Sequence, residues 1–229
     1  MTSMPDIDAV RAEYLRRMTC GSGALLRQVE AYCASRKGKM LRPRLTLLAA
    51  DTLDSSDRNP QRTLLAATCV EMLHNASLLH DDVIDNDSTR RGQPSVNTLW
   101  NNKVAILVGD YHLVQVMRLL DEMDEPDAAR MVNSTVEAMV EAELLAMEDT
   151  PTTKERYLRI IDGKTARLFA TACALGNPAY EDFGLHYGRL FQLHDDIDDN
   201  EATPWTAQLL EEENAALNEI KYKLPIQNI

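Results

Sequence analysis

Apolar residues recur along the chain with the spacing of amphipathic helices. Between residues 40 and 53, Leu45, Leu48 and Ala49 follow the i, i+3, i+4 pattern that places side chains on one face of a helix. The same periodicity predicts further helices over residues 61–85, 104–123, 128–149, 157–175 and 183–199. No segment sustains the alternation of apolar and polar residues that is typical of a strand, so we expect no sheet. The pattern therefore predicts an all-α bundle with six to eight core helices.

Polar segments separate these helices. Residues 86–95 read NDSTRRGQPS and are expected to form a loop. Residues 150–155 read TPTTKE, with Thr152 or Thr153 as the N-cap of the helix that follows. The N-terminal segment mixes acidic and basic residues and lacks the apolar core of a signal peptide. No run approaches the roughly 18 apolar residues of a membrane span, so no transmembrane segment is expected.

Charge and cysteine content limit the partners and the compartment. The 229 residues include 24 Lys plus Arg and 36 Asp plus Glu, which gives a formal net charge of −12. Nucleic acid and anionic membrane surfaces attract basic proteins, so we expect neither as a partner. The four cysteines are widely spaced and form no C-x-x-C pair; they are Cys20, Cys33, Cys69 and Cys173. Such cysteines indicate small buried residues in a reducing compartment, which favours a cytoplasmic protein.

A short acidic pattern occurs twice, each time at the end of an apolar helix. Residues 80–85 read HDDVID and residues 194–199 read HDDIDD, so both fit H-D-D-[V/I]-x-D. We call these segments the first and the second acidic box. Helical geometry places the first and last aspartate of each box on one face, with the middle aspartate beside them. The carboxylates are Asp81, Asp82 and Asp85 in the first box and Asp195, Asp196 and Asp199 in the second.

Each box gathers three carboxylates with no Lys or Arg four residues away to relieve their repulsion. Mg²⁺ would relieve it, because this hard cation takes oxygen ligands and is commonly held by one or two carboxylates together with substrate phosphates. Neither box has the glycine and the distant glutamate of an EF-hand loop. A solvated acidic helix end stays the alternative interpretation for either box taken alone.

Basic residues are concentrated beside the boxes, although the chain is acidic overall. They are Lys39 and Arg42 near the N-terminus, Arg90 and Arg91 after the first box, and Lys164 before the second. With metal ions between them and the acids, such residues suggest a clamp for a diphosphate group. His74 lies two helical turns before Asp81 on the same stripe, although a lone histidine on a helix is more often structural.

With these motifs the chain resembles the trans-isoprenyl diphosphate synthases, which are all-α enzymes that elongate allylic diphosphates with isopentenyl diphosphate. The matching segments cover about residues 35–200 in the order of the family. They are GKMLRP (38–43), EMLHNASLLHDDVIDNDSTRRG (71–92), AILVGDY (105–111), GKTARLF (163–169) and GRLFQLHDDIDD (188–199). Two acidic boxes with RRG after the first are highly specific to this family. The resemblance implies a helical bundle of the isoprenoid synthase type with a central substrate cavity, formed by residues 1–229 as a single domain.

By position, the resemblance assigns roles to the matching residues. The six carboxylates of the two boxes would hold a cluster of three Mg²⁺ ions on the allylic diphosphate. The expected contacts to that diphosphate are Arg90, Lys164, Thr165 and Gln192. The expected contacts to isopentenyl diphosphate are Lys39, Arg42, His74 and Arg91. Gln192 also fits by helical spacing, because it lies on the face of Asp195 and Asp199.

The implied reaction consists of ionisation, condensation and elimination. Metal ions and cationic side chains stabilise the departing diphosphate, the isopentenyl double bond attacks the allylic cation, and a proton is lost. An apolar cavity would keep water away from the cation. The resemblance also implies a homodimer. In the family, bulky aromatic residues just before the first box give short products, so the resemblance and the small residues Ala76 and Ser77 favour a medium- or long-chain product, with Met117 as an alternative floor of the cavity.

The chain departs from the pattern of the family at several positions. Only 30 residues (200–229) follow Asp199, which makes the chain short at its C-terminal end relative to the family. No Lys occurs between Lys164 and Lys221, so the diphosphate-binding Lys that the family has after the second box lacks an obvious counterpart. Residues 142–146 read AELLA where the family has G-E-x-x-Q, and Asn97 stands where a His is common.

Four interpretations follow from these features. The first is an active prenyltransferase. The second is a weakly active or regulatory subunit of a heteromeric prenyl diphosphate synthase, which the short C-terminal part favours. The third is a terpene cyclase-like lyase, which the D-D-x-x-D form of the second box disfavours. The fourth is a helical scaffold with acidic ends.

Overall fold

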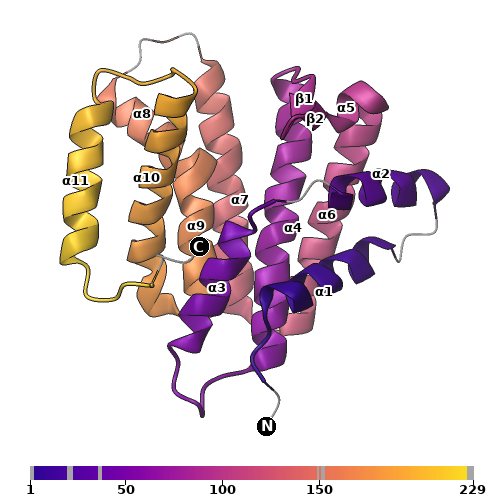
Figure 1. Cartoon of the computed structure of the whole chain (residues 1–229), viewed down its shortest axis with the longest axis horizontal. Coiled ribbons are helices and arrows are strands. Elements are labelled where there is room, and N and C mark those ends of the chain that lie inside the picture. Colours follow the sequence, from indigo (N-terminus) through magenta and orange to yellow (C-terminus); the bar gives the residue numbers. More distant parts are fainter. Residues whose placement is uncertain (1–2, 20–22, 36–37, 149, 151–152, 226–229) are drawn as a thin grey trace. The chain divides into compact units, whose positions relative to one another are not determined.

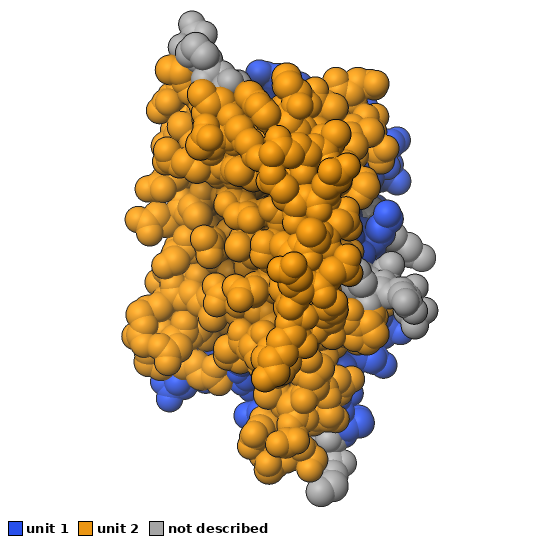
Figure 2. Space-filling model, turned by 90° about the vertical axis from the view of Figure 1, so that its left-hand side faces the viewer, with its two compact units in different colours: residues 1–43, 59–124 blue, residues 44–58, 125–229 orange. Residues whose placement is uncertain are grey.

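The computed structural model describes residues 3–19, 23–35, 38–148, 150 and 153–225. The chain is built almost entirely of helices, as predicted (Figure 1). It forms two compact units, residues 1–43 with 59–124 and residues 44–58 with 125–229 (Figure 2). The single domain expected over residues 1–229 stays a prediction. Cys20, Asp149 and Thr152, which were considered above, lie outside the described residues.

The first unit is organised around the long helix α4 (Pro60–Ile84), which packs along α6 (Asn102–Met123) (Figure 1). Its other helices are α1 (Ile7–Thr19), α2 (Ala24–Ser35) and α5 (Val96–Leu99), and α3 (Leu41–Asp51) begins in it. Helix α4 starts at Pro60 because Asn59 caps it: Asn59 Oδ1 accepts the N–H of Arg62 at 3.1 Å, and proline at the first position has no N–H to satisfy.

A buried arginine joins the first helix of this unit to α6. Arg17 is 4% exposed, and its Nη1 donates to Glu122 Oε1 at 2.8 Å while its Nε donates to Glu13 Oε1 at 2.7 Å. These ion pairs hold the pKa of both glutamates below the usual value, chiefly through the hydrogen bonds from Arg16 to Glu13 and from Arg17 to Glu122. The buried charge is therefore fully paired, as burial requires.

The expectation of no sheet is wrong for residues 89–94. Strands β1 (Thr89–Arg90) and β2 (Gln93–Pro94) form a short antiparallel pair inside the segment expected to be a loop. Arg91 and Gly92 connect the strands with φ values of 55° and 73°, and two left-handed residues in succession are what a two-residue type I′ turn requires. Strands of two residues are too short for any alternation to show in the sequence.

The second unit is arranged around α10 (Glu181–Asp198), which packs against both α9 (Arg167–Gly176) and α11 (Thr206–Glu219) (Figure 1). Helices α7 (Pro126–Met147) and α8 (Lys154–Ile161) and the 3₁₀ turn Pro178–Tyr180 belong to the same unit. Phe169 of α9 is fully buried, and its ring packs against Tyr187 and Phe191 of α10. This aromatic cluster joins α9 to α10.

The helix predicted over residues 157–175 is longer and less regular than its periodicity suggests. It begins at Lys154, because Thr153 Oγ1 accepts the N–H of Arg156 at 3.2 Å as an N-cap. Residues Asp162–Ala166 are wound as a π-helix, a form that is rare and frequent at functional sites. Gly163 allows this segment to approach α7, since a Cβ at this position would lie 2.4 Å from the carbonyl oxygen of Ala138.

Helices α1, α2, α5 and α11 were not among the helices predicted from the periodicity. Within the part of the chain that is described, no helix is both long enough and apolar enough to cross a membrane. Cys69 and Cys173 are buried, as predicted, and burial raises the pKa of both thiols to about 12. Cys33 is half-buried, and none of these three cysteines forms a disulfide.

Candidate active site

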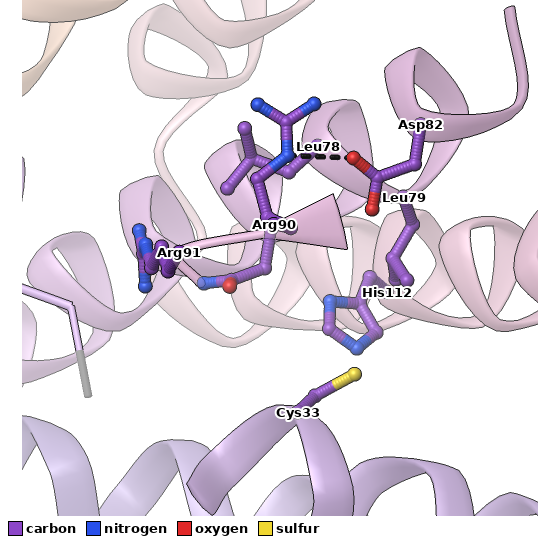
Figure 3. A pocket seen from close by; sticks show the side chains of 8 residues that line it. Cys33, Leu78, Leu79, Asp82, Arg90, Arg91 and His112 are labelled. Atoms are coloured by element: carbon purple, nitrogen blue, oxygen red, sulfur yellow. Dashed lines mark hydrogen bonds and ion pairs between the residues drawn. The ribbon is translucent and has the colours of Figure 1, made fainter. Parts of the chain in front are cut away.

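The first acidic box forms the last turn of α4. Asp82 is 1% exposed, whereas Asp81 is half-buried and Asp85 is exposed as the C-cap residue. Arg90 of β1 donates from Nε to Asp82 Oδ1 at 2.6 Å (Figure 3). Its Nη2 donates to Asp87 Oδ2 at 2.9 Å. Asp82 is thus engaged in an ion pair inside the unit, and the outer carboxylates lie nearer to solvent.

The second box forms the last turn of α10 and repeats this division. Asp196 is 7% exposed, while Asp195 and Asp199 are exposed. Tyr157 of α8 donates its hydroxyl hydrogen to Asp196 Oδ2, and Gln192 donates from Nε2 to Asp196 Oδ1 at 2.7 Å. In both boxes, therefore, the middle carboxylate is buried and hydrogen-bonded, and the outer carboxylates are more accessible.

Both boxes end in the same backbone turn. Asn86 and Asn200 follow the last aspartate with φ values of 55° and 62°. The N–H of the next residue, Asp87 or Glu201, donates to the carbonyl oxygen of the middle aspartate at 3.0 and 2.7 Å, which is the six-to-one bond of a Schellman motif. The sequence analysis stopped at the last aspartate and missed the asparagines, although both segments extend to H-D-D-x-x-D-N.

A chain of hydrogen bonds runs from the second box to the π-helical segment. Thr165 donates its hydroxyl hydrogen to Gln192 Oε1 at 2.5 Å, while the amide nitrogen of Gln192 donates to Asp196. Three predicted site residues are therefore brought together in one chain. Lys164, the neighbour of Thr165, is exposed.

Tyr157 is a further member of this chain that the sequence analysis missed. Its ring packs with Ile161, Leu193 and Leu209 in a hydrophobic cluster. Burial, with the Asp196 carboxylate as a second cause, raises the pKa of the Tyr157 hydroxyl well above its usual value, so the group stays protonated and donates. Nothing in the sequence marks this tyrosine, because it meets Asp196 only through the packing of α8 on α10.

His80, the first residue of the first box, lies against α6. Its Nε2 is 3.3 Å from the carbonyl oxygen of Ile106 and 3.4 Å from Oδ1 of Asp110. A Cβ at Gly109 would lie 2.3 Å from this nitrogen, so the glycine leaves the space that the imidazole occupies. The glycine that interrupts the apolar run of α6 is thus explained by the packing of the box.

The basic residues near the first box gather around His74. Arg42 Nη1 donates to His74 Nε2 at 3.2 Å, so the proton of the neutral ring is on Nδ1. Burial, aided by Arg42 and Arg91, lowers the pKa of His74 well below its usual 6.5 and keeps the ring neutral. Glu71 lies one turn earlier on α4, and burial raises the pKa of its carboxyl although Asn75 donates a hydrogen bond to it.

Arg91 also approaches the segment that carries Lys39 and Arg42. A Cβ at Gly38 would lie 2.5 Å from Arg91 Nη1, so the glycine makes room for the guanidinium. Lys39 follows and is exposed. The structure therefore brings the segments 38–43 and 90–91 together near His74, within the first unit.

A small pocket lies beside the Asp82–Arg90 ion pair (Figure 3). It is lined by Cys33, Asn75, Leu78, Leu79, Asp82, Arg90, Arg91 and His112. His112 is fully buried, its Nε2 lies 2.9 Å from Glu30 Oε1, and its Nδ1 has no hydrogen-bond partner among the described residues. The pocket therefore combines two arginines that reach solvent with the buried residues Asp82 and His112.

Asn97 stands where the related family commonly has a histidine, and it holds the turn after the first box. Its Nδ2 donates to the carbonyl oxygen of Asp82 at 2.9 Å and to that of Asp87 at 3.2 Å. The residue thus supports the same turn that Asn86 closes. Asn97 therefore makes a structural contact to the box.

The two residues considered for product length lie in different surroundings. Ala76 is 1% exposed within the core of the first unit. Ser77 is half-buried, and its hydroxyl donates to the carbonyl oxygen of His74 at 2.9 Å. Met117, the alternative floor of the cavity, is 66% exposed.

The predicted site residues fall into two groups, one in each unit. The first unit holds Lys39, Arg42, His74, Ala76, Ser77, Asp81, Asp82, Asp85, Arg90 and Arg91, and the second holds Lys164, Thr165, Gln192, Asp195, Asp196 and Asp199. That the two boxes face each other across a central cavity stays a prediction. Among the described residues, no three His, Cys, Asp or Glu side chains converge to hold a metal ion by themselves. The outer carboxylates nevertheless fit Mg²⁺, which is typically held by one or two carboxylates together with substrate phosphates.

Comparison with known proteins shows which family these motifs match. The profile of the family described as Polyprenyl synthetase matches residues 23–208. The all-trans-nonaprenyl-diphosphate synthase (geranyl-diphosphate specific) of Rhodobacter capsulatus is 37% identical over 186 residues, which cover 76% of this chain and 57% of the relative. The octaprenyl diphosphate synthase of Escherichia coli is 31% identical over 234 residues, which cover 96% of this chain and 71% of the relative.

The structural comparison agrees with the sequence comparison. A crystal structure of a decaprenyl diphosphate synthase from Rhodobacter capsulatus superposes with a TM-score of 0.78 at 33% sequence identity, covering 87% of this chain and 67% of that one. The chain spans 57% of the length of the first relative named above. The helical fold, the boxes and the basic segments thus match proteins that are longer than this chain.

Proposed function

Because the chain belongs to the polyprenyl synthetase family, we propose that it condenses isopentenyl diphosphate with an allylic diphosphate to make an all-trans polyprenyl diphosphate of medium or long chain. One observation carries the proposal: two H-D-D-x-x-D-N segments share a buried middle aspartate, more accessible outer carboxylates and a left-handed asparagine. A chance acidic helix end would have no reason to repeat all three features.

The accessible carboxylates would hold Mg²⁺ on the allylic diphosphate. These are Asp81 and Asp85 in the first box and Asp195 and Asp199 in the second. The bound ions would neutralise the charge that develops on the departing diphosphate. Asp82 and Asp196 were also expected to hold metal ions, which stays a prediction; their hydrogen bonds to Arg90, Gln192 and Tyr157 support a further role in holding the boxes in place.

The basic residues would divide between the two substrates as the family pattern implies. Lys164, Thr165, Gln192 and Arg90 would contact the allylic diphosphate, and Lys39, Arg42, His74 and Arg91 the isopentenyl diphosphate. The neutral ring of His74 supports this division, because its Nδ1–H is available as a donor while Nε2 accepts from Arg42. Arg42 is thereby oriented, and a fixed guanidinium loses little entropy when it binds a phosphate.

The same proposal extends to product length and assembly. The small side chain of Ser77, one turn before Asp81, supports a medium or long product, since a bulky group there would shorten the space beyond the reacting ends.

A homodimer is supported by Leu107, Val114 and Met117 of α6, which are 66%, 43% and 66% exposed. Their spacing of seven and three residues is typical of a helix that pairs with another helix. The cytoplasm is supported by described cysteines that form no disulfide.

The test is a product assay with matched variants. The purified chain is incubated with Mg²⁺, labelled isopentenyl diphosphate and allylic primers of several lengths, and the products are resolved by chromatography. Elongated products that are lost in Asp81→Asn and in Asp195→Asn are the expected result. Turnover that requires an added partner chain would indicate a subunit of a heteromeric synthase instead. A cyclised hydrocarbon as the product would overturn the proposal. So would the absence of any product with every allylic primer tested.

A further inference from the structure

Arg189 of α10 is the centre of a partly buried network of charges that the reaction above does not use. Arg189 lies one turn before Gln192, and its Nε and Nη2 donate to the two carboxylate oxygens of Asp162 at 2.6 and 2.8 Å. Its Nη1 donates to Oε1 of Glu213 on α11 at 3.1 Å. The other carboxylate oxygen of Glu213, Oε2, is hydrogen-bonded to His186 Nδ1. Glu213 is 6% exposed, so this charge is paired inside the unit rather than solvated.

The position of Asp162 gives this network a consequence for the site. Asp162 is the first residue of the π-helical segment, and Lys164 and Thr165 follow within the same segment. The segment is held at two points by consecutive turns of α10, at Asp162 by Arg189 and at Thr165 by Gln192. A π-helical turn is rare and usually occurs as a single turn within an α-helix, so we expect contacts from neighbouring elements to help to hold it.

Helix α11 is connected to the π-helical segment through this network, and it also packs on neighbouring elements through apolar side chains. Leu209 of α11 packs with Tyr157, Ile161 and Leu193. A second ion pair joins α11 to α8 at the surface: Lys154 Nζ donates to Glu212 Oε1 at 3.0 Å. Glu212 and Glu213 are therefore neighbours on α11 with different partners. Glu212 pairs with Lys154 of α8, whereas Glu213 pairs with Arg189, which binds Asp162 of the π-helical segment.

We propose that Glu213 and Arg189 are positioning residues that hold the π-helical segment, and with it Lys164 and Thr165, in the conformation that binds the allylic diphosphate. The inference rests on the proposed function for the ligand, but the conformational part does not depend on it. A bidentate arginine fixes both the distance and the orientation of Asp162, which a lysine could not do. Glu213 in turn fixes the guanidinium from the side of α11.

The experiment compares Glu213→Gln with Glu212→Gln, a matched substitution on the adjacent residue. Hydrogen exchange of the amides of residues 162–167 measures the conformation of the segment without any substrate. We expect Glu213→Gln to raise this exchange about tenfold, and Glu212→Gln to leave it as in the wild type. Asp162→Asn disrupts the same Asp162–Arg189–Glu213 network at Asp162, which is more exposed than Glu213. This variant replaces Glu213→Gln in the experiment if Glu213→Gln does not fold.

Steady-state kinetics supply the second readout. We expect Glu213→Gln and Asp162→Asn to raise the KM for the allylic diphosphate about 10- to 100-fold and to leave the KM for isopentenyl diphosphate unchanged, because a displacement of about 1 Å at a contact suffices for such a loss. Glu212→Gln should leave both KM values unchanged. Equal amide exchange in the Glu212 and Glu213 variants, or a parallel rise of both KM values, overturns the inference. If the wild type transfers no prenyl group, the proposed function fails while the exchange data still decide the conformational role.

Discussion

Asn86 and Asn200 hold the same left-handed backbone conformation, each one residue after the last aspartate of an acidic box. This conformation turns the chain sharply, so that the next N–H returns to the carbonyl oxygen of the middle aspartate. The helix therefore ends at the last aspartate of the box, and the outer carboxylates are presented at a helix end rather than along a helix side. Two segments that lie 114 residues apart in the sequence thus share a side-chain pattern and a backbone turn.

The left-handed turn makes a prediction about Asn86. Replacing it by Gly should leave the free energy of unfolding nearly unchanged, whereas Asn86→Val should lower it by about 1–2 kcal/mol, because a β-branched residue is strained at positive φ. Urea unfolding followed by circular dichroism measures both variants. The matched pair Asn200→Gly and Asn200→Val should behave alike, and equal stability of the Gly and Val variants would show that the turn is not under this constraint.

The ion pair between Asp82 and Arg90 separates two roles within the first box. Asp82→Ala should lower the free energy of unfolding by about 2–3 kcal/mol, since a hydrogen-bonded buried partner is lost while Arg90 stays partly exposed to water. Asp81→Asn should change stability by less than about 1 kcal/mol but abolish Mg²⁺-dependent turnover. Denaturant unfolding and the prenyl-transfer assay, run on both variants, measure the two effects.

A double-mutant cycle provides the control for this prediction. If Asp82 acts mainly through Arg90, the double variant with Arg90→Ala should be destabilised by much less than the sum of the two single changes. Additive losses would show that Asp82 contributes through other contacts. Equal loss of stability in the Asp81 and Asp82 variants would contradict the division of roles.

Helical periodicity predicts most of this fold, and the failure at α11 has a physical cause. The helix over residues 61–85 is found at Pro60–Ile84, because its apolar residues are numerous and a proline and an asparagine mark its start. Helix α11 was missed because its sequence is rich in glutamate and only Leu209 and two polar residues, Thr206 and Glu213, are buried. A buried glutamate contributes nothing to an apolar pattern.

The candidate site divides in the same way. The acidic boxes and the basic residues beside them are visible in the sequence, because they are local clusters of like charge. Tyr157 and Arg189 are not visible, because each acts on a partner in another element, 39 and 27 residues away. The π-helical turn at Asp162–Ala166 also escapes prediction, since it depends on the space that Gly163 leaves for α7. Local chemistry can be read from the sequence, and the contacts that orient it require the fold.

Product length gives a prediction at Ser77. Ser77→Phe should shorten the products of the prenyl-transfer assay by several isoprene units, because a phenyl ring one turn before Asp81 would fill space that a growing prenyl chain needs. Ser77 is half-buried, so the ring can be accommodated at less cost than at Ala76, which is fully enclosed. Reverse-phase chromatography of dephosphorylated products measures the length. Unaltered products in Ser77→Phe would refute the assignment, and shortened products in Met117→Phe alone would favour Met117, which is 66% exposed, as the floor of the cavity.

The neutral state of His74 makes stability depend on pH in a defined direction. Burial lowers the pKa of this histidine below its usual 6.5, so the unfolded chain binds the proton first as the pH falls. The stability associated with the neutral ring is therefore complete above about pH 6.5 and is lost progressively below it.

His74→Gln keeps an acceptor for Arg42 but cannot titrate, so between pH 7 and pH 5.5 it should lose about 1 kcal/mol less of its unfolding free energy than the wild type. Urea unfolding at a series of pH values measures the difference, in which the titration of other groups cancels. If His74→Gln instead follows the wild-type curve, the pKa of His74 is the same in the folded and the unfolded chain, and burial does not keep the ring neutral.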